Sequence, residues 1–263
     1  MSTNSLLRSS QRITHRFLDI ILPPHCAGCQ RTGSVLCASC LATFTGETSQ
    51  ACTRCGTLLP PTGICPYCPT YRPALSGLRA VGCFDGPLRS CIHALKYEGN
   101  TRLAEPLGAV LAQAYIRWGL QADAIIPVPL HHKREQERGY NHAQLLAEVC
   151  AAHLHIPLRS DIVVRHRATA AQVGLNGQER RQNVAGAFEC VPPFKTGLLR
   201  DRTLLLLDDV CTTGATLAAC ASPLFAAGAK TVWGLVLARP YEDQGGRRQS
   251  FLRGKNFYTN PTF

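Results

Sequence analysis

Four C-x-x-C pairs between residues 26 and 68 constrain this chain more than any other feature of its sequence. The pairs are Cys26/Cys29, Cys37/Cys40, Cys52/Cys55 and Cys65/Cys68. Two residues between thiolates let one tight turn present both sulfurs to the same ion, and two such turns complete a tetrahedron around Zn²⁺. A single pair is also typical of a thiol redox site, but four pairs so close together favour metal. These eight cysteines therefore predict two zinc ions.

The pairing of the four motifs stays open at the level of sequence. Sequential pairing gives the sets 26/29/37/40 and 52/55/65/68, and an interleaved pairing satisfies the same spacing. The segment 25–70 has few large apolar residues, so we expect metal binding to supply its folding free energy. Four protein thiolates leave no coordination position for water, which predicts structural rather than catalytic zinc.

The ends of the chain bear on its compartment. Residues 1–24 predict an amphipathic helix, which Pro23 and Pro24 end just before the cysteines begin. Such a helix suits a membrane surface or a targeting segment, but we expect it to pack on its own protein. No stretch approaches the ~18 to 20 apolar residues of a membrane span, so we expect no stable membrane insertion. Without a cleavable signal segment, we expect a cytoplasmic protein with reduced thiols.

Composition places the rest of the chain among globular proteins. Apolar residues make up 45% of its 263 residues, which excludes wholesale disorder. The formal net charge of +11 is typical of proteins that bind anions, including nucleic acids. Residues 241–263 are polar and basic, and predict a flexible tail. Of the six cysteines outside the pairs, all but Cys211, which lies in the candidate site described below, are expected to be small core residues.

After residue 72, short apolar runs alternate with stretches of helical periodicity. We expect strands at 80–84, 124–128, 162–164, 203–207 and 231–238, and helices at 88–97, 103–118, 141–153 and 216–227. Alternation of this kind predicts an α/β domain with a mostly parallel sheet flanked by helices. Ligands of such sheets bind beyond the carboxyl ends of the strands.

A strong candidate site follows the most apolar of these strands. The run of four leucines at 204–207 leads directly into Asp208 and Asp209, and then into a loop of small and hydroxyl residues, 210–216. Adjacent carboxylates can accept hydrogen bonds from a vicinal diol or hold Mg²⁺ through water. The loop opens a helix, whose N-terminal N–H groups favour an anion. A sugar phosphate satisfies both halves, whereas P-loop and dinucleotide-binding glycine motifs are absent from the sequence.

The segment LLLLDDVCTTGAT, residues 204–216, resembles the phosphoribosyl pyrophosphate (PRPP) signature of type I phosphoribosyltransferases. Three further segments and the cysteine-paired N-terminus resemble the ComF/GntX family of competence-associated phosphoribosyltransferase-like proteins. These segments are HALKYEGN (93–100), PVPLHHKREQERGYNHAQLLA (127–147) and AAQVGLNGQERRQNVAGAF (170–188). The resemblance spans about residues 18–240. It implies a double zinc ribbon at 25–72 and a phosphoribosyltransferase-like domain at 73–240.

The resemblance also implies roles for particular residues. Asp208 and Asp209 would contact the ribose hydroxyls of PRPP as catalytic residues. The loop that would bind the 5′-phosphate consists of Val210, Cys211, Thr212, Thr213, Gly214, Ala215 and Thr216. The basic residues Lys133, Arg134 and Arg138 would bind pyrophosphate, which clustered guanidinium groups suit by charge and geometry.

A mobile loop that closes over the site is expected at 166–187. It carries Gln172, Arg180, Arg181 and Asn183, of which Arg180 is expected to cover the pyrophosphate and exclude water as a third catalytic residue. Lys96 is a further candidate for contact with an anion.

Two functions remain open on these grounds. The first is transfer of phosphoribose from PRPP, bound with Mg²⁺, to an unidentified acceptor, in a protein linked to DNA uptake. The second is an accessory protein that handles nucleic acid and whose PRPP site is regulatory or vestigial. Single-stranded DNA and competence or recombination proteins are the candidate partners of the second function, and the sequence leaves the oligomeric state open.

Overall fold

The computed structural model describes residues 23–44, 75–169, 176–194 and 197–240, together with residues 52, 54–56, 59, 62–65 and 68. The helix predicted within residues 1–24 lies almost wholly outside these residues. The basic tail after residue 240 and Gln172 lie outside them as well.

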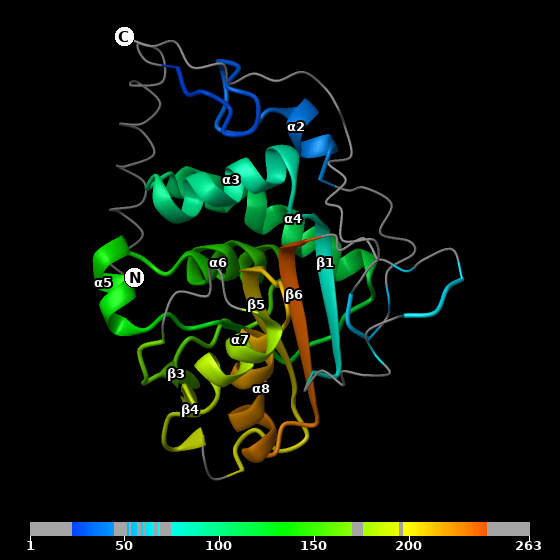
Figure 1. Ribbon diagram of the computed structural model, residues 1–263, viewed down its shortest axis with the longest axis vertical. Helices are drawn as coiled ribbons and strands as arrows, with labels where there is room; N and C mark the ends of the chain where they lie inside the picture. Colours follow the sequence, from blue (N-terminus) through cyan, green and yellow to red (C-terminus); the bar gives the residue numbers. More distant parts are fainter. Residues whose placement is uncertain are drawn as a thin grey trace.

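A four-stranded parallel sheet forms the centre of the molecule (Figure 1). Its strands, in spatial order, are β1 (Gly77–Cys83), β6 (Thr231–Arg239), β5 (Thr203–Val210) and β2 (Ala124–Pro127). Leu205 of β5 lies opposite Trp233 of β6 on one side and Ile125 of β2 on the other. The predicted parallel α/β architecture is confirmed.

Helices cover both faces of the sheet. On one face lie α3 (Gly86–Tyr97), α4 (Ala104–Arg117) and α6 (His142–Leu154), with the short 3₁₀ helix η2 (Thr101–Leu103) before α4. The other face packs against α8 (Ala215–Ala226) (Figure 1). The leucine run explains this arrangement: Leu205 and Leu207 enter the core under α3, α4 and α6, while Leu204 and Leu206 enter the core under α8. A strand buried on both faces reads as a continuous apolar run.

Several short elements differ from the sequence-based expectation. The strand expected at 162–164 is β3 (Val163–Arg165), which pairs antiparallel with β4 (Phe188–Cys190) in a separate two-stranded sheet. Two short helices were not predicted, α5 (His132–Arg138) and α7 (Gly177–Val184). Neither has an apolar stripe that a periodicity could reveal: α5 buries no residue, and α7 is set by a capping box between Asn176 and Glu179.

The cysteine-rich segment begins against α3. Its short helix α2 (Ala38–Ala42) and the blue N-terminal chain lie beside α3 in Figure 1. The contact is close, because a Cβ at Gly28 would come within 2.8 Å of the Pro87 side chain. None of the helices in the described part of the chain is long and apolar enough to cross a bilayer.

Candidate functional site

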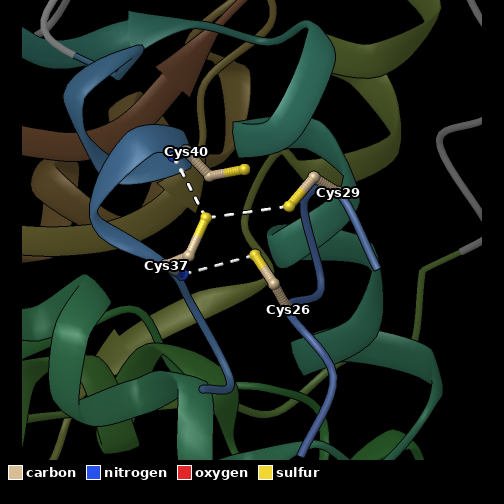
Figure 2. A group of neighbouring side chains, drawn as sticks. All are labelled: Cys26, Cys29, Cys37 and Cys40. Carbon is tan, nitrogen blue, oxygen red and sulfur yellow. Dashed lines mark hydrogen bonds between the residues drawn. The ribbon is translucent and has the colours of Figure 1, made fainter. Parts of the chain in front are cut away.

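The eight paired cysteines form two clusters, each made from motifs that are consecutive in sequence. Cys26, Cys29, Cys37 and Cys40 point their sulfurs toward one centre (Figure 2), and all four lie within 4.8 Å of one another. The second cluster consists of Cys52, Cys55, Cys65 and Cys68, and its four sulfurs also lie within 4.8 Å of one another. Sequential pairing is therefore the arrangement that the chain adopts, and the interleaved alternative is ruled out.

The spacing of the sulfurs fits zinc. A Zn–S bond of about 2.3 Å in a regular tetrahedron separates the sulfurs by about 3.8 Å. The measured separations are 3.7 Å for Cys29 to Cys37, 3.7 Å for Cys52 to Cys68 and 3.5 Å for Cys55 to Cys65. Hydrogen bonds from the Ser39 hydroxyl and the Cys40 amide lower the pKa of Cys37 to about 6, which favours the thiolate that a metal requires.

The acidic pair lies at the carboxyl end of β5 and is deeply buried. Only 2% of the Asp209 side chain is exposed, and its Oδ2 atom contacts the Lys96 ammonium of α3. Its Oδ1 atom lies 3.3 Å from Nε2 of His142, the first residue of α6. The Asp209 amide donates a hydrogen bond of 2.9 Å to Oδ1 of Asp208. Two helices of one layer, α3 and α6, thus converge on the two neighbouring carboxylates at the end of β5.

The surroundings of the two carboxyl groups shift their pKa values in opposite directions. Burial raises the pKa of Asp209, but the charge of Lys96 and the hydrogen bonds from His142 and Lys96 more than offset it and leave the pKa below its usual range. For Asp208, burial and the charge of Asp209 raise the pKa to about 8. Burial lowers the pKa of His142. Asp209 is therefore a fixed negative charge, whereas Asp208 retains capacity to bind a ligand.

A chain of contacts links the acidic pair to the basic segment after β2. Nη1 of Arg138 lies 2.6 Å from Nδ1 of His142. Because a guanidinium can only donate, Nδ1 accepts this hydrogen bond, and the imidazole proton lies on Nε2, facing Asp209. The Arg138 guanidinium also stacks over the ring of Tyr97, 5.3 Å from its centroid. His142 thus connects a predicted ribose contact with a predicted pyrophosphate contact.

The loop after β5 is held by the backbone and by a residue from α7. The Cys211 amide donates to the Ala238 carbonyl of β6 at 3.0 Å, and the Cys211 side chain is buried in the core. Gly214 has a φ of +80° and is the N-cap of α8, where no side chain caps the helix. Arg180 reaches across from α7, and its Nη1 donates to the Thr212 hydroxyl at 2.7 Å.

A cavity of about 920 Å³ joins these features at the carboxyl end of the sheet. Predicted site residues in its wall are Asp208, Asp209, Val210, Thr212, Thr216, Arg134, Arg138, Arg180 and Lys96. Thr213, Gly214 and Ala215 form the turn behind the wall. Lys133 lies on the exposed side of α5.

Several polar residues of the wall escaped sequence reasoning, and Arg165 and His142 are the two that bear most directly on the site. Arg165 of β3 stacks over Phe188, 5.3 Å from the ring centroid, and donates to the Thr169 hydroxyl. It comes from a three-residue strand with no motif around it, so no local signal could have indicated it. His142 did carry a weak signal, because it stands four residues after Arg138 at the start of a predicted helix.

Comparison with known proteins agrees with this organisation. The model of the double zinc ribbon domain matches residues 17–69. The DNA utilization protein YhgH of Shigella flexneri is 35% identical over 206 residues, which cover 75% of this chain and 87% of that protein. This chain belongs to the ComF family. Competence protein F of Haemophilus influenzae is 34% identical over 66% of this chain and 78% of its own length. Competence protein ComFC of Bacillus subtilis is 24% identical over 79% and 81%.

Solved structures similar to this ComF-family chain include two whose titles name phosphoribosyl chemistry. A purine phosphoribosyltransferase from Pyrococcus horikoshii is 17% identical over 52% of this chain and 83% of its own, with a TM-score of 0.32. The glutamine PRPP amidotransferase from B. subtilis is 21% identical over 51% and 25%, with a TM-score of 0.34. At these scores the likeness carries no argument about the site, which stands on its own geometry.

Proposed function

We propose that this ComF-family protein binds PRPP in the cavity at the carboxyl end of its sheet. The observation that carries the proposal is the meeting, in one cavity, of a buried acidic pair with four arginines from three different segments. These arginines are Arg134, Arg138, Arg165 and Arg180. A diol acceptor beside a strongly cationic wall suits a ligand that carries both ribose hydroxyls and several phosphate charges.

The ribose 5-phosphate half of PRPP would lie against β5 and α8. Asp208 and Asp209 accept hydrogen bonds from the ribose hydroxyls, and Lys96 and His142 fix the orientation of Asp209. The 5′-phosphate lies at the loop 210–216. Support for this placement comes from the N-terminus of α8, whose N-cap Gly214 has no side chain, and from the Thr212 and Thr216 side chains in the cavity wall.

The pyrophosphate half would face the arginines of α5, β3 and α7. Arg138 is held by His142 and by Tyr97, so its position is set before the ligand arrives. Preorganised donors favour charge that develops during a reaction. The same wall is therefore suited to a leaving pyrophosphate.

A magnesium ion fits this site only together with the ligand. Both oxygens of Asp209 already face Lys96 or His142, so Asp208 is the carboxylate that would hold Mg²⁺ brought in by pyrophosphate. When bound, Mg²⁺ would neutralise part of the pyrophosphate charge. The transfer that the site supports is attack of an acceptor nitrogen on C1 of the ribose. The C1–O bond breaks, pyrophosphate leaves with the electron pair, and Arg180 excludes water.

The cellular role that fits the family is handling of DNA. Relatives of this chain are named DNA utilization protein and competence protein. We propose that this protein acts in the uptake or use of DNA and that PRPP binding is its molecular activity. Residues 25–72 would serve as the double zinc ribbon and residues 73–240 as the phosphoribosyltransferase-like domain.

The proposal is tested by calorimetric titration of the zinc-loaded full chain with PRPP and Mg²⁺. Ribose 5-phosphate and inorganic pyrophosphate are titrated separately to probe the two halves. We expect Asp208→Asn to weaken ribose 5-phosphate binding by about tenfold or more above pH 8, where the Asp208 carboxyl is ionised, because one charged hydrogen-bond acceptor is then lost. Arg134→Gln should weaken pyrophosphate binding and leave ribose 5-phosphate binding intact.

A matched control is Arg159→Gln, since Arg159 is exposed and pairs with Asp161 outside the cavity wall; its binding of all three ligands should equal that of the unaltered protein. Absence of PRPP binding by the unaltered protein, or equal binding by Asp208→Asn, contradicts the proposal. Transfer is tested separately, by release of pyrophosphate from PRPP in the presence of a panel of nitrogen acceptors. Binding without release favours the regulatory or vestigial alternative.

A further inference from the structure

Arg239, the last residue of β6, connects two parts of the molecule that are far apart in sequence. Its Nη1 atom donates a hydrogen bond to the carbonyl of Cys55, a member of the second cysteine cluster. Its Nη2 atom donates to the carbonyl of Thr212 at 3.2 Å. One guanidinium therefore joins the cluster at 52–68 to the loop after β5.

At the second cysteine cluster, Arg239 contacts the turn between Cys52 and Gly56. The Gly56 amide donates to the Cys52 carbonyl at 2.9 Å, and Gly56 has a φ of +69°. The turn lies directly on the edge of the sheet, because the Leu78 amide of β1 donates to the Arg54 carbonyl at 3.1 Å. A Cβ at Gly56 would come within 2.9 Å of the Leu78 carbonyl oxygen. Cys52 and Cys55, which bound this turn, both belong to the second cluster, so an ion held there would fix the shape of the turn.

On the loop side, Thr212 is held from two directions. Arg239 binds its carbonyl, and Arg180 of α7 binds its hydroxyl. The preceding amide, that of Cys211, donates to the Ala238 carbonyl beside Arg239. The position of the loop is thus set by β6 and its terminal guanidinium, before any ligand binds.

We propose that Arg239 is a positioning residue through which the metal-loaded second cluster holds the phosphate-binding loop in its binding conformation. The proposal rests on the proposed binding of a 5′-phosphate by residues 210–216. A guanidinium is a rigid, planar fork that donates in two directions at once, whereas the compact ammonium of lysine reaches one carbonyl at a time. The zinc ribbon is on this view a part of the ligand site and not only a separate module.

The first test compares Arg239→Met and Arg239→Lys with the unaltered protein. We expect both variants to retain two zinc ions per chain and to bind ribose 5-phosphate about tenfold more weakly. Binding of inorganic pyrophosphate, which would contact the arginines of α5, β3 and α7, should stay unchanged. A general loss of structure would weaken both ligands together, so this selectivity separates positioning from folding.

The second test removes metal from one cluster at a time and follows amide hydrogen exchange of residues 210–216. Cys65→Ser should release the ion of the second cluster, raise exchange in the loop and weaken ribose 5-phosphate binding by about as much as Arg239→Met. In the Arg239→Met background, the same change should add little, because the link is already broken. The matched control is Cys29→Ser in the first cluster, which should leave exchange in the loop unchanged.

The outcomes separate this proposal from the proposed function. If the unaltered protein binds neither PRPP nor ribose 5-phosphate, the proposed function fails, while the exchange measurement still tests the link. If Arg239→Met leaves both loop exchange and ribose 5-phosphate affinity unchanged, the link is refuted whatever the protein binds. Independent effects of Cys65→Ser and Arg239→Met, which multiply in the double variant, also refute it. The Arg239 variants keep all eight thiolates, so they decide the matter even if Cys65→Ser fails to fold.

Discussion

At the scale of single residues, Asp209 is the clearest case of a buried charged side chain. Its side chain is 2% exposed, and the ion pair with Lys96 joins it to a residue whose side chain is 20% exposed. A buried ion pair is not in itself a large gain in stability, but breaking one from a single side is costly, since the remaining charge loses its partner.

We therefore predict that Lys96→Met destabilises the protein by about 3 kcal/mol. Asp209→Asn removes the charge from the other side and keeps a hydrogen-bonding group for His142. The double variant should be less destabilised than the sum of the two single variants, because it leaves no unpaired charge. Urea unfolding of the zinc-loaded proteins measures the stability of the unaltered protein, the two single variants and the double variant. Strictly additive losses would show that the pair is not coupled.

Residues of the site could be predicted from sequence only where they share a local motif. Asp208, Asp209 and the loop that follows them occupy one continuous segment, and the buried strand before them fixes where they lie. His142 and Arg165 enter the cavity from other elements, and their places depend on how those elements pack. Contacts of that kind have no signature in a single chain, so sequence reasoning missed them.

At the scale of elements, the turn from β5 into α8 has a backbone conformation that glycine adopts readily and other residues do not. Gly214 has a φ of +80°, and a Cβ there would meet only the Cys211 sulfur at 3.8 Å. Space is therefore available for a side chain, and the cost of one is conformational.

We predict that Gly214→Ala lowers the free energy of unfolding by about 1 kcal/mol and also weakens ribose 5-phosphate binding, because the loop must shift to relieve the strain. Gly119→Ala is the matched control: Gly119 has a φ of +59°, has no atom within 4 Å of a Cβ, and lies outside the cavity wall. Its variant should lose similar stability with unchanged binding. Unfolding curves measure the stability of each variant, and calorimetry measures its affinity for ribose 5-phosphate. Unchanged ligand affinity in Gly214→Ala would contradict a role of this turn in binding.

The elements that sequence predicted best are those with a strong apolar pattern. The strand expected at 203–207 is extended to Val210, and the helix expected at 216–227 begins one residue earlier, at Ala215. The short elements α5, α7 and β4 have no such pattern. The start of α7 is set by a local capping box, which has no apolar periodicity, and the position of β4 is set by its pairing with β3, which depends on tertiary structure.

At the scale of the whole molecule, we expect metal binding by the two cysteine clusters to stabilise the N-terminal segment, which has few large apolar residues. We predict two zinc ions per chain by elemental analysis. Cys29→Ser and Cys65→Ser should each reduce the content to about one ion, since three thiolates hold the metal less tightly. Cys83→Ser is the control, because Cys83 is an exposed thiol outside both clusters, and it should leave the content at two. Loss of both ions from either single cluster variant would contradict independent sites.

The net charge of +11 has a partial explanation at this scale. Arg134, Arg138, Arg165 and Arg180 line one cavity, which is where we propose that pyrophosphate binds. Sequence reasoning expected the arginines near 133–138 and 180–181 to face one phosphate site, and of these the structure brings Arg134, Arg138 and Arg180 to one wall. It could not foresee that β3 would contribute another, because the antiparallel pairing of β3 with β4 was not predicted.

The convergence on Asp209 has a consequence for the order in which this chain can fold. Its carboxylate leaves water only when both α3, which carries Lys96, and α6, which carries His142, have docked on the sheet. With either helix absent, β5 would carry an unpaired charge into the core, at a cost of several kcal/mol. Burial of the acidic pair therefore depends on assembly: the Asp209 carboxylate has both of its partners only in a chain in which α3 and α6 have docked on the sheet.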